Sequence, residues 1–110
     1  MSSFRIFDIV GSALSAQSAR LNTVASNLAN ADSVGSTPEA AYKARMPVFQ
    51  TALDAADPAS AGVRVLGVVE SQAEAVRRFE PGNPLADGDG YVYASNVNTV
   101  EEMTNMISAS

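Results

Sequence analysis

Two rows of residues in the first third of the chain repeat every seven positions and are offset by three. The rows are Phe7, Leu14, Leu21 and Leu28, and then Val10, Gln17, Val24 and Ala31. This is the spacing of the a and d positions in a coiled-coil helix, here over nearly four heptads, and we call these residues the heptad seam. No proline interrupts residues 1–34, and turn chemistry follows at residues 30–33. The pattern predicts a helix of about thirty residues, ~45 Å long.

The heptad seam is expected to need more cover than one copy of the chain provides. A compact unit of about sixty residues, built from the chain up to Ser95, has a radius of gyration of only ~10 Å. Such a unit is too small for a stripe ~45 Å long, so we expect the seam to pair with other helices, from this chain or from neighbouring copies. Ser, Asn and Thr are frequent in this segment, so the helix alone should be marginal and should order on assembly.

Composition excludes several functional classes. The 110 residues allow one modest domain, and the net charge of −5 argues against nucleic acid or an anionic membrane surface as a partner. The chain has neither Cys nor His, so it lacks thiolates and the commonest general base and metal ligand. No apolar run reaches the length of a membrane span, so we expect no membrane insertion. Asp8 interrupts the apolar stretch near the N-terminus, which argues against a cleaved signal peptide.

The middle of the chain, residues 34–95, reads as a small β module of three or four strands. Residues 42–50 alternate in character and predict a strand, which Pro47 restricts to a sheet edge or a bulge. Residues 51–59 are rich in Ala and Asp and predict a short helical turn or a loop. Residues 63–69 predict the strongest strand, residues 72–78 are ambiguous although Val76 and Phe79 suggest a strand, and residues 91–93 predict a short one.

Helical periodicity returns at the C-terminal end. Asn98 and Glu101 have the spacing of a capping box, and Thr99 and Glu102 offer the same box one residue later. An a/d stripe follows, with one flanking residue: Val100, Met103 and Ile107, flanked by Met106. The stripe reaches Ser110 without a C-cap residue, so we expect the heptads to continue beyond it.

The expected fold class is α+β. The long N-terminal helix should pair with the C-terminal helix as a coiled coil, so that residues 1–33 and 96–110 form one discontinuous helical domain and residues 34–95 are inserted between its halves. The seam alone leaves open whether the two helices run parallel or antiparallel.

The candidate chemical motifs favour structure over catalysis. The segment from Asp87 to Gly90 resembles part of an EF-hand, but the ligand positions would fall on Leu85 and Asn96, so we expect a turn. Glu101 and Glu102 are explained by capping. The sequence therefore predicts no catalytic, cofactor-binding or metal site.

Two asparagines beside the seam have two possible roles. Asn27 and Asn30 could be exposed helix surface and helix end, or their amides could bond across helices and fix the register of a subunit interface.

Two stretches resemble the flagellar basal-body rod proteins of the axial rod and hook family, most closely the proximal-rod type. The first is Arg5 to Ser33, with the signature around ASNLANA at residues 25–31, and the second is Asn83 to Ser110. Together they cover about half of the chain, with weaker support from residues 42–44 and 48–50. The loop over residues 34–41 and the region 51–63 match the family poorly.

The resemblance implies a structural subunit and not an enzyme. It implies export through the flagellar type III apparatus without a cleaved signal, and polymerisation through terminal helices into the periplasmic rod that transmits torque. Implied partners are further copies, the rod proteins FlgB, FlgF and FlgG, and a FliE-like adaptor. The expected subunit-interface residues are the eight of the heptad seam with Asn27 and Asn30, and, at the C-terminal end, Val100, Met103, Met106 and Ile107. The competing hypothesis is a small adaptor whose amphipathic helix docks in a partner's groove.

Overall fold

The computed structural model describes residues 3–54 and 57–110. The elements in chain order are α1 (Ser3–Ala29), β1 (Val34–Gly35), β2 (Arg45–Asp54), β3 (Asp57–Glu70), β4 (Val76–Phe79), β5 (Tyr91–Ala94) and α2 (Thr99–Ala109). The predicted α+β class is confirmed, although the described residues form five strands in two sheets, where a module of three or four strands was expected. Neither helix is long and apolar enough, within the described residues, to cross a membrane.

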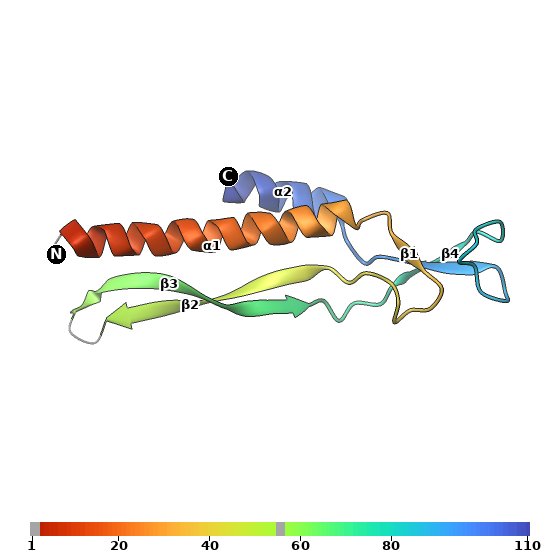
Figure 1. Ribbon diagram of the computed structural model, residues 1–110, viewed down its shortest axis with the longest axis horizontal. Helices are drawn as coiled ribbons and strands as arrows, with labels where there is room; N and C mark the ends of the chain where they lie inside the picture. The colour runs from red at the N-terminus through yellow and green to blue at the C-terminus, as the bar shows by residue number, and fades with distance from the viewer. Residues whose placement is uncertain (1–2, 55–56) are drawn as a thin grey trace.

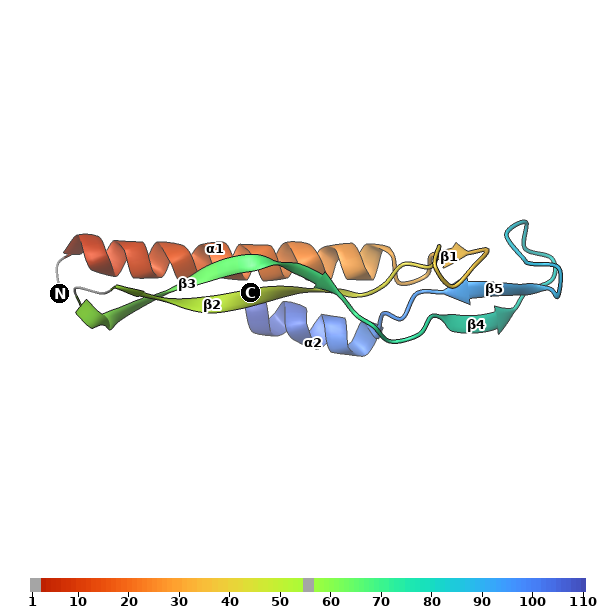
Figure 2. The same ribbon diagram turned by 90° about the horizontal axis from the view of Figure 1, so that it is seen from below.

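Helix α1 and the antiparallel pair β2–β3, which we call the hairpin, run side by side along most of the molecule (Figures 1 and 2). The molecule is therefore elongated, with extents of 64 × 24 × 16 Å. The expectation of a compact middle module is wrong. An extended hairpin rises more than 3 Å per residue, so a few tens of residues are enough to follow a long helix.

The hairpin contains the main departure from the sequence-based assignment. Residues 51–54 continue β2, and β3 begins at Asp57, where a helical turn or loop was expected; residues 55 and 56 lie outside the described part. Pro47 is tolerated because both strands of a two-stranded sheet are edge strands. A register shift follows at once, between Val48 and Phe49, where Leu66 is the extra residue of a bulge.

The other three strands form a small sheet at the far end of the molecule, the tip sheet, in the order β1-β5-β4 (Figure 1). Val92 on the central strand is fully buried. The Phe79 and Tyr91 rings meet edge to face at 5.1 Å, and Arg77 stacks on the Tyr91 ring at 3.6 Å from its centroid. Gly90, with φ of +87°, makes the turn into β5, where a Cβ would lie 2.9 Å from the Phe79 ring.

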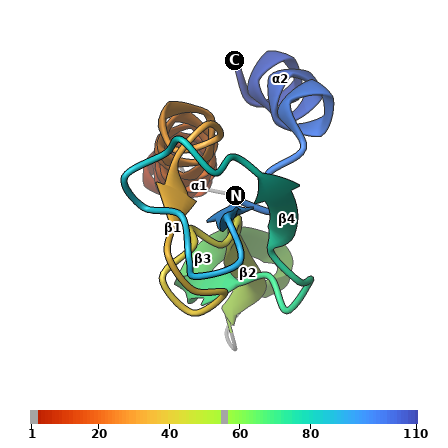
Figure 3. The ribbon, with the colours of Figure 1, turned by 90° about the vertical axis from the view of Figure 1, so that its right-hand side faces the viewer.

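Helix α2 lies beside the C-terminal half of α1 and runs antiparallel to it, which settles the direction that the sequence left open (Figures 1 and 2). The two helices lie on one side of the hairpin in the end-on view (Figure 3). The predicted N-cap is confirmed, because the Asn98 side chain accepts a hydrogen bond of 3.1 Å from the Glu101 N–H.

Candidate assembly surface

The hairpin packs on the small and polar face of α1. Ala16, Thr23 and Asn27 are buried on this face. Farther toward the N-terminus, the Ser12 hydroxyl accepts a hydrogen bond of 3.0 Å from the Val63 N–H. A Cβ on Gly62 would lie only 3.0 Å from the same hydroxyl, so the strand backbone approaches the helix closely at this point. Close approach requires small residues, and the sequence places them on this face and not in the seam.

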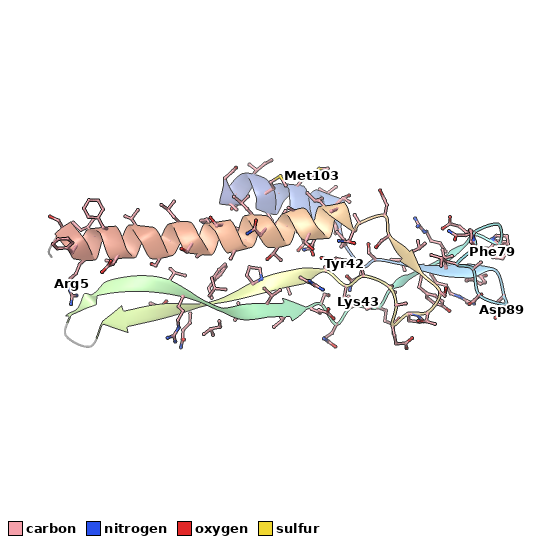
Figure 4. All side chains as sticks on the ribbon, in the orientation of Figure 1. Arg5, Tyr42, Lys43, Phe79, Asp89 and Met103 are labelled. Carbon is pink, nitrogen blue, oxygen red and sulfur yellow. The ribbon has the colours of Figure 1, made fainter. Side chains whose placement is uncertain are left out.

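Asn27 fastens the base of the hairpin to α1. Its side chain is 1% exposed and makes three hydrogen bonds. Oδ1 accepts from the Arg45 N–H at 2.9 Å and from the Tyr42 hydroxyl at 2.8 Å, and Nδ2 donates to the Arg45 carbonyl at 2.8 Å. Tyr42 lies below the C-terminal end of α1 in Figure 4. Asn27 is therefore neither exposed surface nor, in this structure, a cross-helix contact. Asn30 donates to the Ser26 carbonyl of its own helix at 2.9 Å, as expected for a helix end.

The Asn96 side chain forms a second set of hydrogen bonds between distant segments, which the sequence did not predict. Its Oδ1 accepts from the Ala44 N–H at 2.6 Å and its Nδ2 donates to the Ala73 carbonyl at 2.8 Å. This side chain joins the segments that precede β2, follow β3 and precede α2. The adjacent Ser95 hydroxyl donates to the Ala31 carbonyl at 2.7 Å. The only hint in the sequence was a polar pair directly after a strand, which is too common a pattern to be specific.

Half of the heptad seam is left in solvent. Phe7 is 71% exposed, Val10 49% and Leu14 64%, and Gln17 is also exposed. Farther along the seam the exposure falls: Leu21, Leu28 and Ala31 are half-buried, and Val24 is 3% exposed where the helices meet the base of the hairpin. The structure thus divides the seam into an open N-terminal part and a covered C-terminal part.

Helix α2 is also packed with its apolar stripe outward. Val100, Met103, Met106 and Ile107 are exposed, whereas Glu102 and Ala109 are buried. Met103 points away from α1 in Figure 4. The contact to α1 includes a hydrogen bond of 3.4 Å from Arg20 Nη2 to Asn105 Oδ1. Helix α2 therefore does not contact α1 through its own apolar stripe, as the expected coiled coil required, although the seam residue Val24 of α1 is buried near α2. We call this arrangement the reversed packing of α1 and α2.

A groove of about 380 Å³ lies where α1, α2 and the base of β2 converge. Arg20, Arg45 and Glu102 are among the charged residues that line it. Arg45 is 3.9 Å from the Glu70 carboxylate and lies over the Tyr42 ring at 5.6 Å. Glu102 is 6% exposed, and its Oε2 atom is buried without a hydrogen bond.

The acidic turn before β5 is closed by its own backbone. Asp87 Oδ1 accepts from the Tyr91 N–H at 2.9 Å and from the Asp89 N–H at 3.0 Å. These bonds, with the Tyr91 N–H first in importance, lower the pKa of Asp87, and the Arg77 charge and the Tyr93 hydroxyl act in the same direction. The segment is a turn, as expected. The described residues contain no group of three or more acidic side chains placed to hold a metal ion.

Comparison with known proteins identifies the family. Two family models match the two ends: Flagella basal body rod protein over residues 7–36, and Flagellar basal body rod FlgEFG protein C-terminal over residues 89–110. The flagellar basal-body rod protein FlgC of Salmonella typhimurium strain LT2 is 56% identical over 111 residues, which cover 100% of this chain and 81% of that protein. The chain belongs to the FlgC family. FlgC of Escherichia coli O6:H1 is 54% identical over the same shares of both chains.

More distant FlgC proteins match as well. FlgC of Agrobacterium fabrum strain C58 is 40% identical over 104 residues, covering 93% of this chain and 73% of that protein. The expected resemblance to the flagellar basal-body rod proteins is therefore confirmed. This FlgC-family chain is a structural rod subunit of the flagellar basal body and associates with other components of the rod.

Proposed function

We propose that the chain polymerises into the proximal rod through the outward apolar faces of α1 and α2, and that the rod serves as the drive shaft that carries torque. The observation that carries this proposal is the reversed packing. Phe7, Leu14 and, on α2, Ile107, at 77% exposed, hold large apolar surfaces in solvent, while most of the buried residues of the two helices are small or polar. Contiguous exposed apolar surface is typical of an interaction site.

The heptad spacing favours helices as the structures that cover these faces. Knobs at a and d positions fit into holes formed by four residues of a facing helix. In the rod we place the open part of the seam, and the α2 residues Val100, Met103 and Ile107, against helices of the assembly. Asn27 is occupied by the base of the hairpin, so we do not assign it to the interface.

We place the chain in the periplasmic part of the rod, in contact with FlgB, FlgF, FlgG and a FliE-like adaptor. We further propose that it arrives unfolded through the flagellar type III apparatus without a cleaved signal. Support comes from family membership and from a chain without Cys, in which no disulfide can hinder threading. We assign it no catalytic, cofactor or metal-dependent role.

A charge placed in the open part of the seam tests the proposal. Leu14→Asp should leave the free subunit folded, because Leu14 is exposed there. It should abolish rod assembly, because burying an unpaired carboxylate costs several kcal/mol. The matched control is Ser15→Asp, an exposed neighbour outside the seam. Swarming and the yield of basal bodies are measured in cells that lack the native gene, and circular dichroism is measured on the purified chains.

Normal rods and swarming with Leu14→Asp would refute polymerisation through the seam. A stable one-to-one complex with a single partner, with no polymer, would instead support the adaptor. Equal loss with Ser15→Asp would show that the whole helix surface is sensitive to charge, and it would also count against the seam.

A further inference from the structure

Glu102 is a buried residue whose carboxylate oxygen Oε2 receives no hydrogen bond within the described part of the chain. The residue is 6% exposed, and no described residue donates a hydrogen bond to Oε2. Burying an unpaired carboxylate is costly, and folded proteins normally supply a cation or a set of N–H donors. Glu102 lies in the first turn of α2, a position that suits acidic side chains but gives Oε2 no hydrogen-bond donor.

The two arginines that line the same groove, Arg20 and Arg45, have partners other than Glu102. Arg20 donates from Nη2 to Asn105 at 3.4 Å, and Arg45 pairs with Glu70 at 3.9 Å. Neither forms an ion pair with Glu102 within the described residues. The groove therefore holds a carboxylate oxygen that neither arginine is bonded to, and it has room, at about 380 Å³, for an inserted side chain.

Arg64 is the complementary group on the surface. It is exposed on β3, and within the described part of the chain its guanidinium is bonded only to the neutral amide of Gln50, at 2.6 Å. Arg78 already has a carboxylate, Glu80, at 3.4 Å, and Arg77 is stacked on Tyr91. Arg64 thus keeps a full charge with most of its donors unused, and a guanidinium suits bidentate pairing with a carboxylate.

Arg64 and Glu102 lie on different sides of the molecule. Phe49 and Val63 line a pocket together with Ala16 of α1, so their face of the hairpin is turned toward the helix. Side chains alternate along a strand, so Arg64 and its directly paired neighbour Gln50 are on the opposite face. Glu102 is on the helical side. A contact between two residues on different sides that joins different copies is head-to-tail, and such contacts generate a ring where the rotation closes and an open helical filament where it does not.

We propose that Glu102 receives the guanidinium of Arg64 from a second copy of the chain, and that this buried ion pair sets the register between neighbouring subunits. The inference rests on the proposed function, since it needs copies of the chain to assemble. It adds a polar contact that selects one alignment, which apolar faces alone specify weakly.

Neutralising the carboxylate is the first test. Glu102→Gln keeps the shape and should reduce incorporation into rods by about tenfold or more, because removing one charge of a buried pair leaves the other unpaired. Glu101→Gln is the matched control, since Glu101 is exposed in the same helical turn. Thermal unfolding of both purified variants shows whether each subunit is folded. Normal incorporation of a folded Glu102→Gln would overturn the proposal. If Leu14→Asp nevertheless blocks assembly, the proposed function survives that result.

Charge exchange tests the identity of the pair. Glu102→Arg and Arg64→Glu should each block assembly, and the double variant should restore it. Absence of rescue with a folded double variant would overturn the assignment of Arg64. The native chain has no Cys, so Glu102→Cys and Arg64→Cys can be placed in separate, co-expressed copies. Oxidation should then give a crosslinked dimer only when both variants are present, and no dimer from assembled rods would count equally against the pair.

Discussion

The two halves of α1 have the same heptad pattern but different surroundings. In the C-terminal half, Val24 and Asn27 are buried under α2 and the base of the hairpin, at 3% and 1% exposed. In the N-terminal half, Phe7 and Leu14 point into solvent although the hairpin runs along the opposite face of the same turns. A continuous heptad pattern therefore does not imply one continuous contact. One half stabilises the subunit, and we assign the other to assembly.

The largest expected loss of stability comes from replacing Asn27, the residue that bonds the C-terminal half of α1 to the base of the hairpin. Asn27→Ala removes three hydrogen bonds and leaves the backbone groups of Arg45 without their partner. We expect the free energy of unfolding to fall by about 2–4 kcal/mol. Asn22→Ala, on the exposed surface of the same helix, should change it by less than about 0.5 kcal/mol. Urea denaturation measures both, and similar losses would contradict the division of α1 into two halves.

A pair of identical substitutions sharpens the comparison. Val24→Ala should lower the free energy of unfolding by about 2 kcal/mol, because it empties a buried site. Val10→Ala, two heptads earlier in the same row, should leave it unchanged or raise it by up to about 0.5 kcal/mol, since Ala is the better helix former and Val10 is half exposed.

For incorporation into rods we expect the opposite ranking: Val10→Ala should reduce incorporation more than Val24→Ala does. Sedimentation of basal bodies from complemented cells measures this second quantity. Equal stability losses for Val10→Ala and Val24→Ala would show that the N-terminal half is already covered in the free subunit.

The sequence was a good guide to local structure. The long N-terminal helix, the Asn98 cap and the strand at residues 63–69 each depend on neighbours within a few positions, and each is present where it was expected. The class of protein followed from short motifs at the two ends. These features need no knowledge of how distant segments meet.

The arrangement of the elements was harder to predict because hydropathy gave the wrong inner face. Ser12, Ala16 and Thr23 look like an exposed helix surface, yet they allow the hairpin backbone to approach closely. The roles of Asn27 and Asn96 depend on backbone groups far away in the sequence, which no local pattern reveals. An apolar stripe on a short helix suggested an internal coiled coil, but in an assembling subunit the same stripe can be reserved for other chains.

The N-cap of α2 tests how far the covered half depends on the second helix. Asn98→Ala should cost about 1 kcal/mol of stability and reduce the helical signal at 222 nm, because the Glu101 N–H loses its acceptor. Ser108→Ala, on the exposed side near the other end of α2, is the control and should have little effect. If the cap variant were as stable as the native chain, α2 would contribute little to covering α1 at Val24.

The smallest effect is expected at the tip sheet, which is remote from both halves of α1. Hydrogen bonds from the backbone N–H groups of Tyr91 and Asp89 lower the pKa of Asp87 in the folded chain relative to the unfolded one. The stability that Asp87 contributes is therefore complete above the ordinary carboxyl pKa and is lost as the pH falls through the lower folded value. Asp87→Asn should flatten the acid side of the melting-temperature profile, below the ordinary carboxyl pKa. Asp89→Asn removes the same charge from an exposed position in the same turn and is the control. If both variants flatten the profile equally, the acid dependence comes from the net charge and not from the hydrogen bonds of Asp87 in the turn. The tip sheet would then contribute no local, pH-dependent stability of its own.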